Sequence, residues 1–367
     1  MKFLKLRSEE GVMAVAAQPQ EFSVYPPLFG VRRELRCSPL RRFNFTAGDG
    51  SELQLHHTSG GEKGPVIIAP GTAMTALTYC IDTVGTNLVE FLVGEGFDVW
   101  LFDWRTSPLL QAHRHPYSLE DVARYDWPSA LDEVRRLTGK QRVCVLAHCL
   151  SSTCFLLSLL RGYLQPDRIR FFVASQVGLH FQMPVPTTLK IALGADRLAP
   201  AGDMIHQKAE ESTRELSDRV VSLFSRMLPK SCDNLVCRRH RLTFGELIHH
   251  PRVNPATHHL MGDLIPECQV FFLKDVALWS RKGTVLSRAD REHFDRISVP
   301  IRFISGNENR MFTPGSTAQT YRMLCEKNGE DLYRRTVYEG FGHLDCFVGD
   351  GARDALWPDV ASDFENA

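Results

Sequence analysis

Short apolar runs alternate with longer amphipathic segments along much of this chain, which predicts a mostly parallel β-sheet with helices on both faces. The runs expected to form buried strands are 65–69, 96–102, 142–146, 170–174, 300–306 and 335–338. The segments expected to form helices are 86–93, 127–137, 152–160 and 316–326. Asp126 and Pro128 are expected to cap and open the second of these helices. An earlier pair of runs, 42–46 and 53–57, alternates across a Gly-Asp-Gly turn and predicts a hairpin.

A long stretch from about 182 to 296 breaks this rhythm with polar and helical patterns and scattered prolines. We expect it to be an insertion over the carboxyl ends of the strands, where the site of an open α/β sheet lies. The predicted organisation is a leader or peripheral segment (1–40), a first core part (41–181), a lid or cap insertion (182–296) and a second core part (297–367).

The strand at 142–146 ends abruptly, and an apolar helix begins at Ser152. In α/β-hydrolases this strand, tight turn and helix form the nucleophile elbow, written G-x-S-x-G, whose small flanking residues let the backbone expose the central side chain. Here Ala147 and Ser151 occupy the small positions, His148 precedes the central position, and Cys149 takes the place of the serine. The alternative interpretation is a buried structural cysteine at the end of a strand.

A thiol nucleophile requires a base, and His343 has the expected position for it. This histidine follows the last predicted strand in a glycine-containing loop, which agrees with the chain order of nucleophile, acid and histidine in α/β-hydrolases. Most of the 14 histidines fit surface or core-capping roles instead.

The residue that orients the base is expected after the strand at 300–306, where Asn309 stands in place of aspartate. Beside a serine nucleophile this asparagine would be damaging, because a neutral amide cannot stabilise an imidazolium. A thiol can instead pair with histidine as a preformed thiolate and imidazolium, so that asparagine need only hold the ring. Glu308 and Asp345 are the alternative orienting residues.

Two backbone N–H groups should form the oxyanion hole, one after the nucleophile and one after an earlier strand. These are the amides of Leu150 and Thr72. The preceding Gly71 would let the backbone approach a substrate closely.

Several stretches resemble the α/β-hydrolase domains with a cysteine elbow that occur alone or fused to GMC-type, cholesterol-oxidase-like oxidoreductases. The matching stretches, spread over most of 53–358, are 81–83, 98–103, 147–149, 306–309 and 342–346. More distantly the chain resembles polyhydroxyalkanoate synthases and ester hydrolases. The resemblance implies an α/β-hydrolase fold and acyl chemistry through Cys149 on a hydrophobic substrate, within lipid or polyketide metabolism. It implies no cofactor, because the FAD-binding half has no counterpart in this sequence. Pro70 and Ser151 depart from the histidine and glycine of many relatives.

Charge and cysteine content narrow the possible partners. The chain has 43 basic and 43 acidic residues, so neither nucleic acid nor an anionic membrane is an expected partner. No run is apolar and long enough to predict a membrane span, and we expect a cytoplasmic protein with free thiols. Cys232, Cys237 and His240 suggest zinc, but no second close pair completes four ligands, so no metal is expected.

The leading hypothesis is covalent acyl transfer by a Cys149, His343 and Asn309 triad on an apolar ester or thioester, including carrier-linked and CoA-linked ones. With water as acceptor the protein would be an esterase or thioesterase, and with another acceptor an acyltransferase or cyclase. Two other hypotheses stay open: a hydrolase-fold protein that binds an apolar ligand without catalysis, and redox sensing by Cys149 with Cys154 as resolving thiol. The pattern makes no prediction about oligomeric state.

Overall fold

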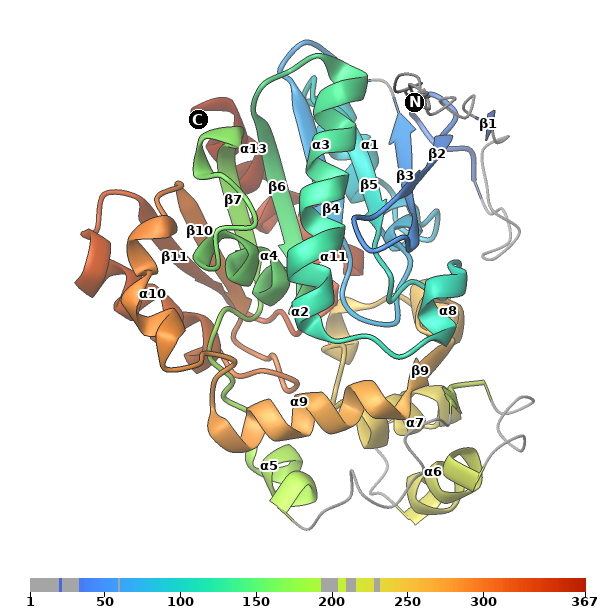
Figure 1. The fold of residues 1–367 in the computed structure, drawn as a ribbon. Coiled ribbons are helices and arrows are strands. Elements are labelled where there is room, and N and C mark those ends of the chain that lie inside the picture. Colours follow the sequence, from blue (N-terminus) through green and yellow to red (C-terminus); the bar gives the residue numbers. More distant parts are fainter. Residues whose placement is uncertain (1–19, 22–32, 59, 193–203, 209–215, 228–231) are drawn as a thin grey trace, which may run out of the picture.

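The computed structural model describes residues 20–21, 33–58, 60–192, 204–208, 216–227 and 232–367 (Figure 1). Most of the expected leader segment, 1–40, therefore lies outside the described residues. Within them, the central feature is a nine-stranded sheet with the order β1-β2-β3-β5-β4-β6-β7-β10-β11. A separate pair of short strands, β8 and β9, lies in the insertion.

The strands agree closely with the apolar runs of the sequence. Their bounds are β1 Gln20–Glu21, β2 Arg41–Thr46, β3 Glu52–Thr58, β4 Pro65–Ala69, β5 Asp98–Asp103, β6 Val143–His148, β7 Ile169–Ser175, β8 Met204–His206, β9 Glu267–Gln269, β10 Ile301–Gly306 and β11 Tyr333–Tyr338. β2 and β3 form the predicted antiparallel hairpin, and β3 is antiparallel to β5. From β5 to β11 the neighbouring strands are parallel. The predicted mostly parallel sheet is confirmed.

Helices cover both faces of this sheet, with α3 and α4 on one side and α1, α11 and α13 on the other (Figure 1). The α-helices are α1 Leu88–Gly94, α2 Leu119–Asp121, α3 Trp127–Thr138, α4 Leu150–Leu160, α5 Val185–Ala192, α6 Leu216–Met227, α7 Leu235–Thr243, α8 Pro255–Leu264, α9 Val270–Lys282, α10 Gly315–Asn328, α11 Asp345–Val348, α12 Ala352–Ala355 and α13 Trp357–Glu365. The 3₁₀ helices are η1 Ala76–Cys80, η2 Gln111–Arg114, η4 Pro166–Arg168, η6 His250–Arg252, η7 Ala289–Glu292 and η8 Phe294–Arg296, and η3 Val122–Asp126 is a π-helical turn.

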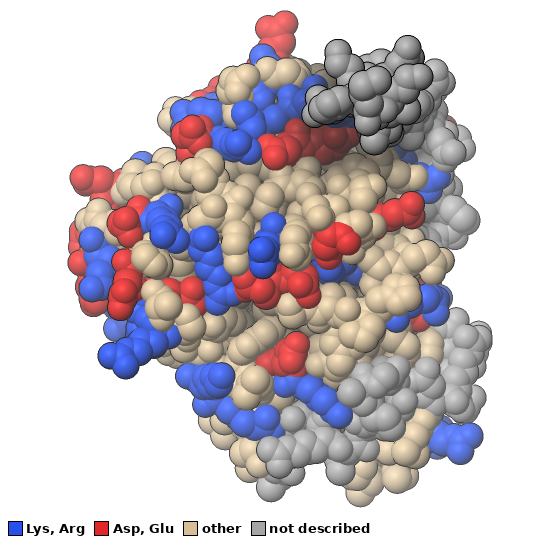
Figure 2. Space-filling model, in the orientation of Figure 1, with Lys and Arg blue, Asp and Glu red and all other residues tan. Residues whose placement is uncertain are grey.

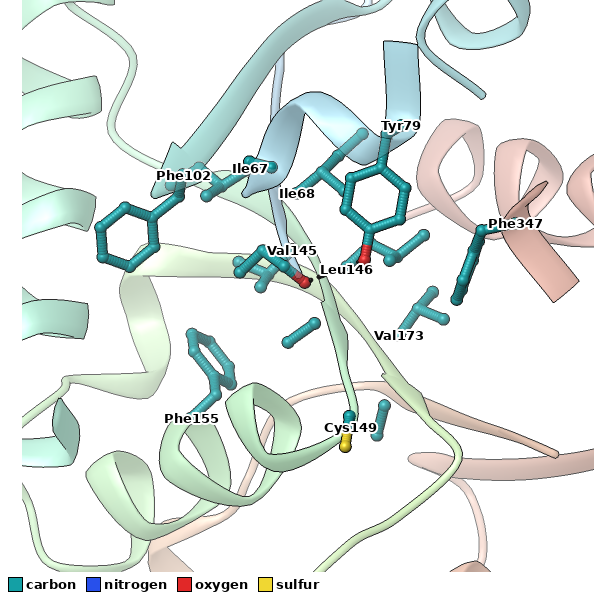
Figure 3. Close-up of a cluster of buried hydrophobic side chains, with 14 of the residues drawn as sticks. Ile67, Ile68, Tyr79, Phe102, Val145, Leu146, Cys149, Phe155, Val173 and Phe347 are labelled. Atoms are coloured by element: carbon teal, nitrogen blue, oxygen red, sulfur yellow. Dashed lines mark hydrogen bonds between the residues drawn. The ribbon is translucent and has the colours of Figure 1, made fainter. Parts of the chain in front are cut away.

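The core includes the whole of β6 and α4, the two elements that flank Cys149. Every residue of β6 and of α4 is buried. α4 carries no charged residue, and its side chains other than four hydroxyl residues are apolar, so it has no strongly polar face to turn toward water. Figure 3 shows Val145, Leu146 and Phe155 packed among side chains from neighbouring elements, with Cys149 at the end of β6 where α4 begins.

The start of α3 differs from the expectation. Asp126 does not cap the helix: it has helical backbone angles, and its side chain makes no capping hydrogen bond. It closes the π-helical turn η3, which follows α2 without a break. Its buried carboxylate instead accepts hydrogen bonds from the backbone and guanidinium of Arg105. The Asp-Trp-Pro pattern marked a helical turn correctly but not the beginning of the helix.

The segment between β7 and β10 contains α5 to α9 with β8 and β9. In Figure 1, α5, α6, α7 and α9 lie beyond the end of the sheet at which β6 leads into α4, which is the carboxyl end of the parallel strands. The segment predicted as an insertion thus lies where a site would be expected.

Basic and acidic side chains are interspersed over the face shown in Figure 2, as the equal numbers of the two charge types suggest. Among the described helices, none combines the length and the apolar character that a bilayer crossing would need.

Candidate active site

Cys149 sits at a sharp turn between β6 and α4. Its backbone has φ 57° and ψ −136°, a conformation that residues with a side chain rarely adopt. The turn is held by a hydrogen bond from the Cys149 N–H to the Ser175 carbonyl at 3.0 Å, and by one from the Ser152 N–H to the Cys149 carbonyl at 3.0 Å. Strained backbone of this kind persists where the surrounding structure fixes it, and it is concentrated at functional sites.

Two backbone amides are directed at the Cys149 thiol: those of Leu150 and Thr72, the pair predicted for an oxyanion hole. The Leu150 amide is the first of α4, so it also carries the positive end of the helix dipole. A Cβ atom at Gly71 would lie 3.1 Å from the Cys149 Cβ, so the close approach of this loop depends on glycine. In Figure 3 the sulfur of Cys149 points away from the hydrophobic cluster around Val145.

His343 and Asn309 meet at the predicted place. The Nδ2 of Asn309 lies 3.1 Å from the Nδ1 of His343, and both residues are buried, with 3% and 2% of their surface exposed. Asn309 follows β10 and His343 follows β11, which are adjacent parallel strands, so their carboxyl ends bring the two loops together. His343 and Cys149 line the same cavity.

The orientation of the Asn309 amide is fixed by the backbone. Its Oδ1 accepts hydrogen bonds from the N–H groups of Met311 at 2.9 Å and Phe312 at 3.0 Å. Its Nδ2 must therefore face His343, and it also donates to the Oε1 of Gln176 at 2.8 Å. Because Nδ2 is a donor only, the Nδ1 of His343 has to accept, and the neutral ring carries its proton on Nε2.

Burial favours the neutral forms of the Cys149 thiol and the His343 ring. It raises the pKa of the Cys149 thiol to about 12, even though the amides of Leu150 and Thr72 favour the thiolate. It lowers the pKa of His343 to about 3. Both shifts oppose the preformed thiolate and imidazolium expected from the sequence, because both charged forms lose their hydration and Asn309 offers no acceptor to an imidazolium.

The two alternative orienting residues have other partners. The carboxylate of Glu308 lies 3.4 Å from Arg310. Asp345 is buried and accepts hydrogen bonds from the backbone N–H groups of Gly342 at 2.7 Å and His249 at 2.9 Å. Asp345 thus shapes the loop that carries His343, while Asn309 makes the contact with the ring.

The remaining elbow residues pack around the turn. Ala147 pairs with Ala69 and Ala174 in the centre of the sheet. The Nδ1 of His148 lies 3.1 Å from the Ser175 hydroxyl, and its ring centroid is 4.5 Å from that of His343. Ser151 is buried, and its carbonyl accepts a hydrogen bond from a tryptophan indole, that of Trp127, at 3.2 Å.

Gln176 is a site residue that the sequence did not reveal. It follows β7 with φ 74°, and its Oε1 accepts from Asn309 and from the Gly306 N–H at 3.2 Å. Its Nε2 donates to the sulfur of Cys346 at 3.0 Å. A glutamine after a strand has no distinctive pattern, so its position at the end of a strand next to β10 would have been the available signal.

A cavity of about 390 Å³ opens beside Cys149 and His343. Most of its other walls are apolar side chains of the insertion, and they include Ile205, Val221, Phe224, Leu242, Phe244, Leu247, Val270, Phe272, Leu273 and Val276. Phe224 is 43% exposed, so the cavity reaches the surface near α6. A lining of this kind suits an aliphatic chain, since each buried methylene contributes about 0.8 kcal/mol.

Comparison of the sequence with known proteins finds distant relatives among lipases and one polymerase. No family model matches. The chain is 24% identical to bovine gastric triacylglycerol lipase over 153 residues, 37% of this chain and 38% of the lipase. It is 21% identical to the poly(3-hydroxyalkanoate) polymerase subunit PhaC of Haloferax mediterranei over 330 residues, 84% of this chain and 61% of that protein. The matches therefore span 38% to 61% of the length of these two relatives.

Solved structures align over nearly the whole chain at low identity. A lipase in its open form covers 89% of this chain and 98% of its own, with a TM-score of 0.56 and 13% identity. A hydrolase from Pseudomonas aeruginosa gives a TM-score of 0.54 at 14% identity with the same coverage. An esterase from Pyrococcus furiosus gives 0.51 at 12%, covering 89% of this chain and 92% of its own. At these identities the likeness concerns the fold.

Proposed function

We propose, from the premise that the chain has the α/β-hydrolase fold, that it transfers an acyl group through a covalent thioester on Cys149. The observation that carries the proposal is the set of contacts at one sulfur atom. Cys149 occupies a strained turn, two backbone amides are directed at its thiol, and it shares an apolar cavity with a buried histidine.

In the first step, the Cys149 sulfur forms a bond to the acyl carbon of an ester or thioester. The bond from that carbon to the leaving oxygen or sulfur breaks, and the thiol proton ends on the leaving group. The amides of Leu150 and Thr72 are placed to stabilise the negative oxygen of the tetrahedral intermediate. His343 transfers the proton through Nε2, the ring nitrogen that does not face Asn309. To accept the thiol proton there, the ring must first carry its own proton on Nδ1, which requires the Asn309 amide to turn its Oδ1 toward the ring.

In the second step, an acceptor hydroxyl, amine or water attacks the thioester carbon. The carbon–sulfur bond breaks, and the proton lost by the acceptor returns to the Cys149 thiol through His343. The substrate class follows from the cavity, whose apolar walls favour an aliphatic acyl chain over a charged one. The likeness to lipases and to a polymerase subunit supports both kinds of acceptor.

A second candidate function is the binding of an apolar ligand without catalysis. The orientation of Asn309 favours it, because an amide that donates to Nδ1 of His343 leaves no acceptor to stabilise an imidazolium. The cavity would then serve as the whole binding site.

Intact-protein mass spectrometry after exposure to a panel of acyl thioesters and activated esters separates these two functions. We expect one acyl adduct per chain on the native protein, no adduct on Cys149→Ala, and a slower one on His343→Ala. Decay of the adduct in water identifies a hydrolase, whereas decay only after addition of an alcohol or amine identifies a transferase.

Cys325→Ser is the matched control, since Cys325 is a half-buried free thiol that does not line the cavity. It should acylate at the native rate. The binding function is established instead if the native protein forms no adduct and turns over no member of the panel, but binds an apolar ester without changing it.

A further inference from the structure

We propose that Cys232, Cys237, His250 and His258 bind a structural zinc ion within the insertion, beside the segment that supports the loop carrying His343. One ligand atom from each of these residues lies within 4.8 Å of every other. The residues come from three places: Cys232 lies just before α7 and Cys237 within it, η6 begins with His250, and α8 contains His258. None of the four lines the cavity beside Cys149, so the proposal is independent of the proposed function.

The distances fit a tetrahedral ion. In a site with two sulfur and two nitrogen ligands at ordinary zinc bond lengths, a sulfur and a nitrogen lie about 3.6 Å apart. The Nε2 of His258 is 3.0 Å from the sulfur of Cys237 and 3.8 Å from that of Cys232. The rings of His250 and His258 are 5.2 Å apart between centroids and tilted by 58°, so they do not stack. Two thiolates and two imidazoles are the donor set that selects zinc.

A buried nitrogen without a partner gives a second, independent indication. The Nε2 of His250 is shielded from solvent and has no hydrogen-bond partner among the described residues. A buried polar atom normally has a partner, because leaving it unpaired costs about 1 to 3 kcal/mol. A metal ion would satisfy it. A cavity of only about 10 Å³ borders Cys237 and His250, which excludes an organic ligand there.

The proposed ligand set differs from the Cys232, Cys237 and His240 pattern of the sequence. His240, the histidine considered there, is not one of the four residues, and its Nε2 lies 3.1 Å from the Ile265 carbonyl oxygen. The second pair of ligands is instead His250 and His258, which are eight positions apart. These two histidines are too far apart in the sequence to form a recognisable ligand pattern. They come together only because η6 and the turn before α8 fold the chain back.

Hydrogen bonds on both sides of His250 connect the proposed zinc site to the loop that carries His343. On one side of His250, the Leu344 N–H donates to the Leu247 carbonyl at 2.8 Å and the His249 N–H donates to Asp345 at 2.9 Å. On the other, Arg252 donates to the Gly340 carbonyl at 3.1 Å. An ion on His250 would therefore fix the segment that supports both sides of His343.

The test begins with the metal content of the purified full-length protein. We expect about one zinc per chain by plasma mass spectrometry, and cobalt in its place should give the thiolate charge-transfer band and visible bands of a tetrahedral site. Cys237→Ser and His250→Ala should each lower the zinc content at least tenfold. If a variant fails to fold, the cobalt spectrum of the native protein still tests the proposal.

His259→Ala and Cys325→Ser are the matched controls, because His259 is an exposed neighbour of His258 and Cys325 is a free thiol outside the cluster. Both should keep the full zinc content. The proposal is overturned when the reduced native protein, equilibrated with zinc and then desalted, retains less than about a tenth of an ion per chain, or when its cobalt form lacks the thiolate band. It is also overturned when the controls lose zinc as the ligand variants do.

Discussion

Asn309 determines which nitrogen of His343 carries the proton. To present an acceptor to Nδ1, the amide would have to turn over, and it would give up its bonds from Met311 and Phe312 and its bond to Gln176. At about 1 kcal/mol for each hydrogen bond, this costs about 3 kcal/mol. An aspartate in the same place would accept from Nδ1 without turning over and would lose only the bond to Gln176, because a carboxylate cannot donate to its Oε1.

We therefore expect Asn309→Asp to speed acylation of Cys149, by about 10²-fold if most of that cost is recovered. The measurement is the rate of adduct formation by rapid-quench mass spectrometry. Asn307→Asp is the control, because Asn307 lies in the same loop but bonds to Glu339 and to the Gly340 amide. An unchanged or slower rate in Asn309→Asp would show that the amide orientation does not limit the reaction.

The neutral forms of Cys149 and His343 also predict how the alkylation rate of the Cys149 thiol depends on pH. Because the pKa of Cys149 is raised to about 12 and that of His343 is lowered to about 3, the thiolate fraction should grow tenfold per pH unit through the neutral range. Alkylation of Cys149 by iodoacetamide, followed by peptide mass spectrometry from pH 6 to about 10, should show this slope without a plateau. A plateau across the neutral range would mean a preformed ion pair.

At the scale of single residues, the sequence predicted which residues meet at the candidate site but not how their side chains are oriented. Cys149, Asn309 and His343 could be placed because each follows a recognisable strand, and parallel strands end at one edge. The direction of the Asn309 amide and the presence of Gln176 depend on the positions of particular backbone N–H groups, and these positions follow from loop geometry that has no pattern in the sequence.

Among the elements, the strands were the most predictable and the helix beginnings the least. β4 has the bounds expected from its apolar run, Pro65–Ala69, because a fully buried parallel strand leaves a continuous apolar signal. Asp126 was misinterpreted because a buried aspartate paired with a distant arginine has the same local sequence as a cap. The pairing partner, Arg105, lies 21 residues away.

Asp126→Asn should destabilise the fold by about 3 kcal/mol, since it leaves the buried Arg105 guanidinium without its main counter-charge. Urea unfolding followed by circular dichroism measures the change. Asp132→Asn is the control on α3, where the carboxylate is exposed and its ion pairs contribute little. A loss below about 1 kcal/mol in Asp126→Asn would indicate that the remaining Asp49 contact suffices.

For the molecule as a whole, the cavity was the feature that the sequence could not specify. The insertion was recognised as a break in the strand rhythm, but which of its side chains face Cys149 depends on how α6, α7 and α9 pack over the sheet. The division of the chain into core and insertion as domains, and the relation to GMC-type fusions, stay predictions.

Val221→Trp should narrow the far part of the cavity, because Val221 is a buried residue of α6 in its wall. We expect kcat/KM to fall at least about tenfold for long-chain esters and to change little for short-chain ones. Initial rates across a series of nitrophenyl esters test this. Val185→Trp, at a position that is 80% exposed, should leave the series unchanged. An equal loss for all chain lengths would place Val221 outside the acyl path.

The hydrogen bonds from Leu344 to Leu247 and from His249 to Asp345 also bear on how such a protein can be re-engineered. They join chain positions 96 or more residues apart, so the loop that carries His343 is held partly by the segment between β7 and β10. A chimera that exchanges the whole of 182–296 for the corresponding segment of a protein with the same fold would remove both the apolar wall of the cavity and the contacts that hold the His343 loop. Grafts meant to alter substrate range should therefore stop before residue 232, so that they keep the proposed zinc ligands as well as the contacts of Leu247 and His249.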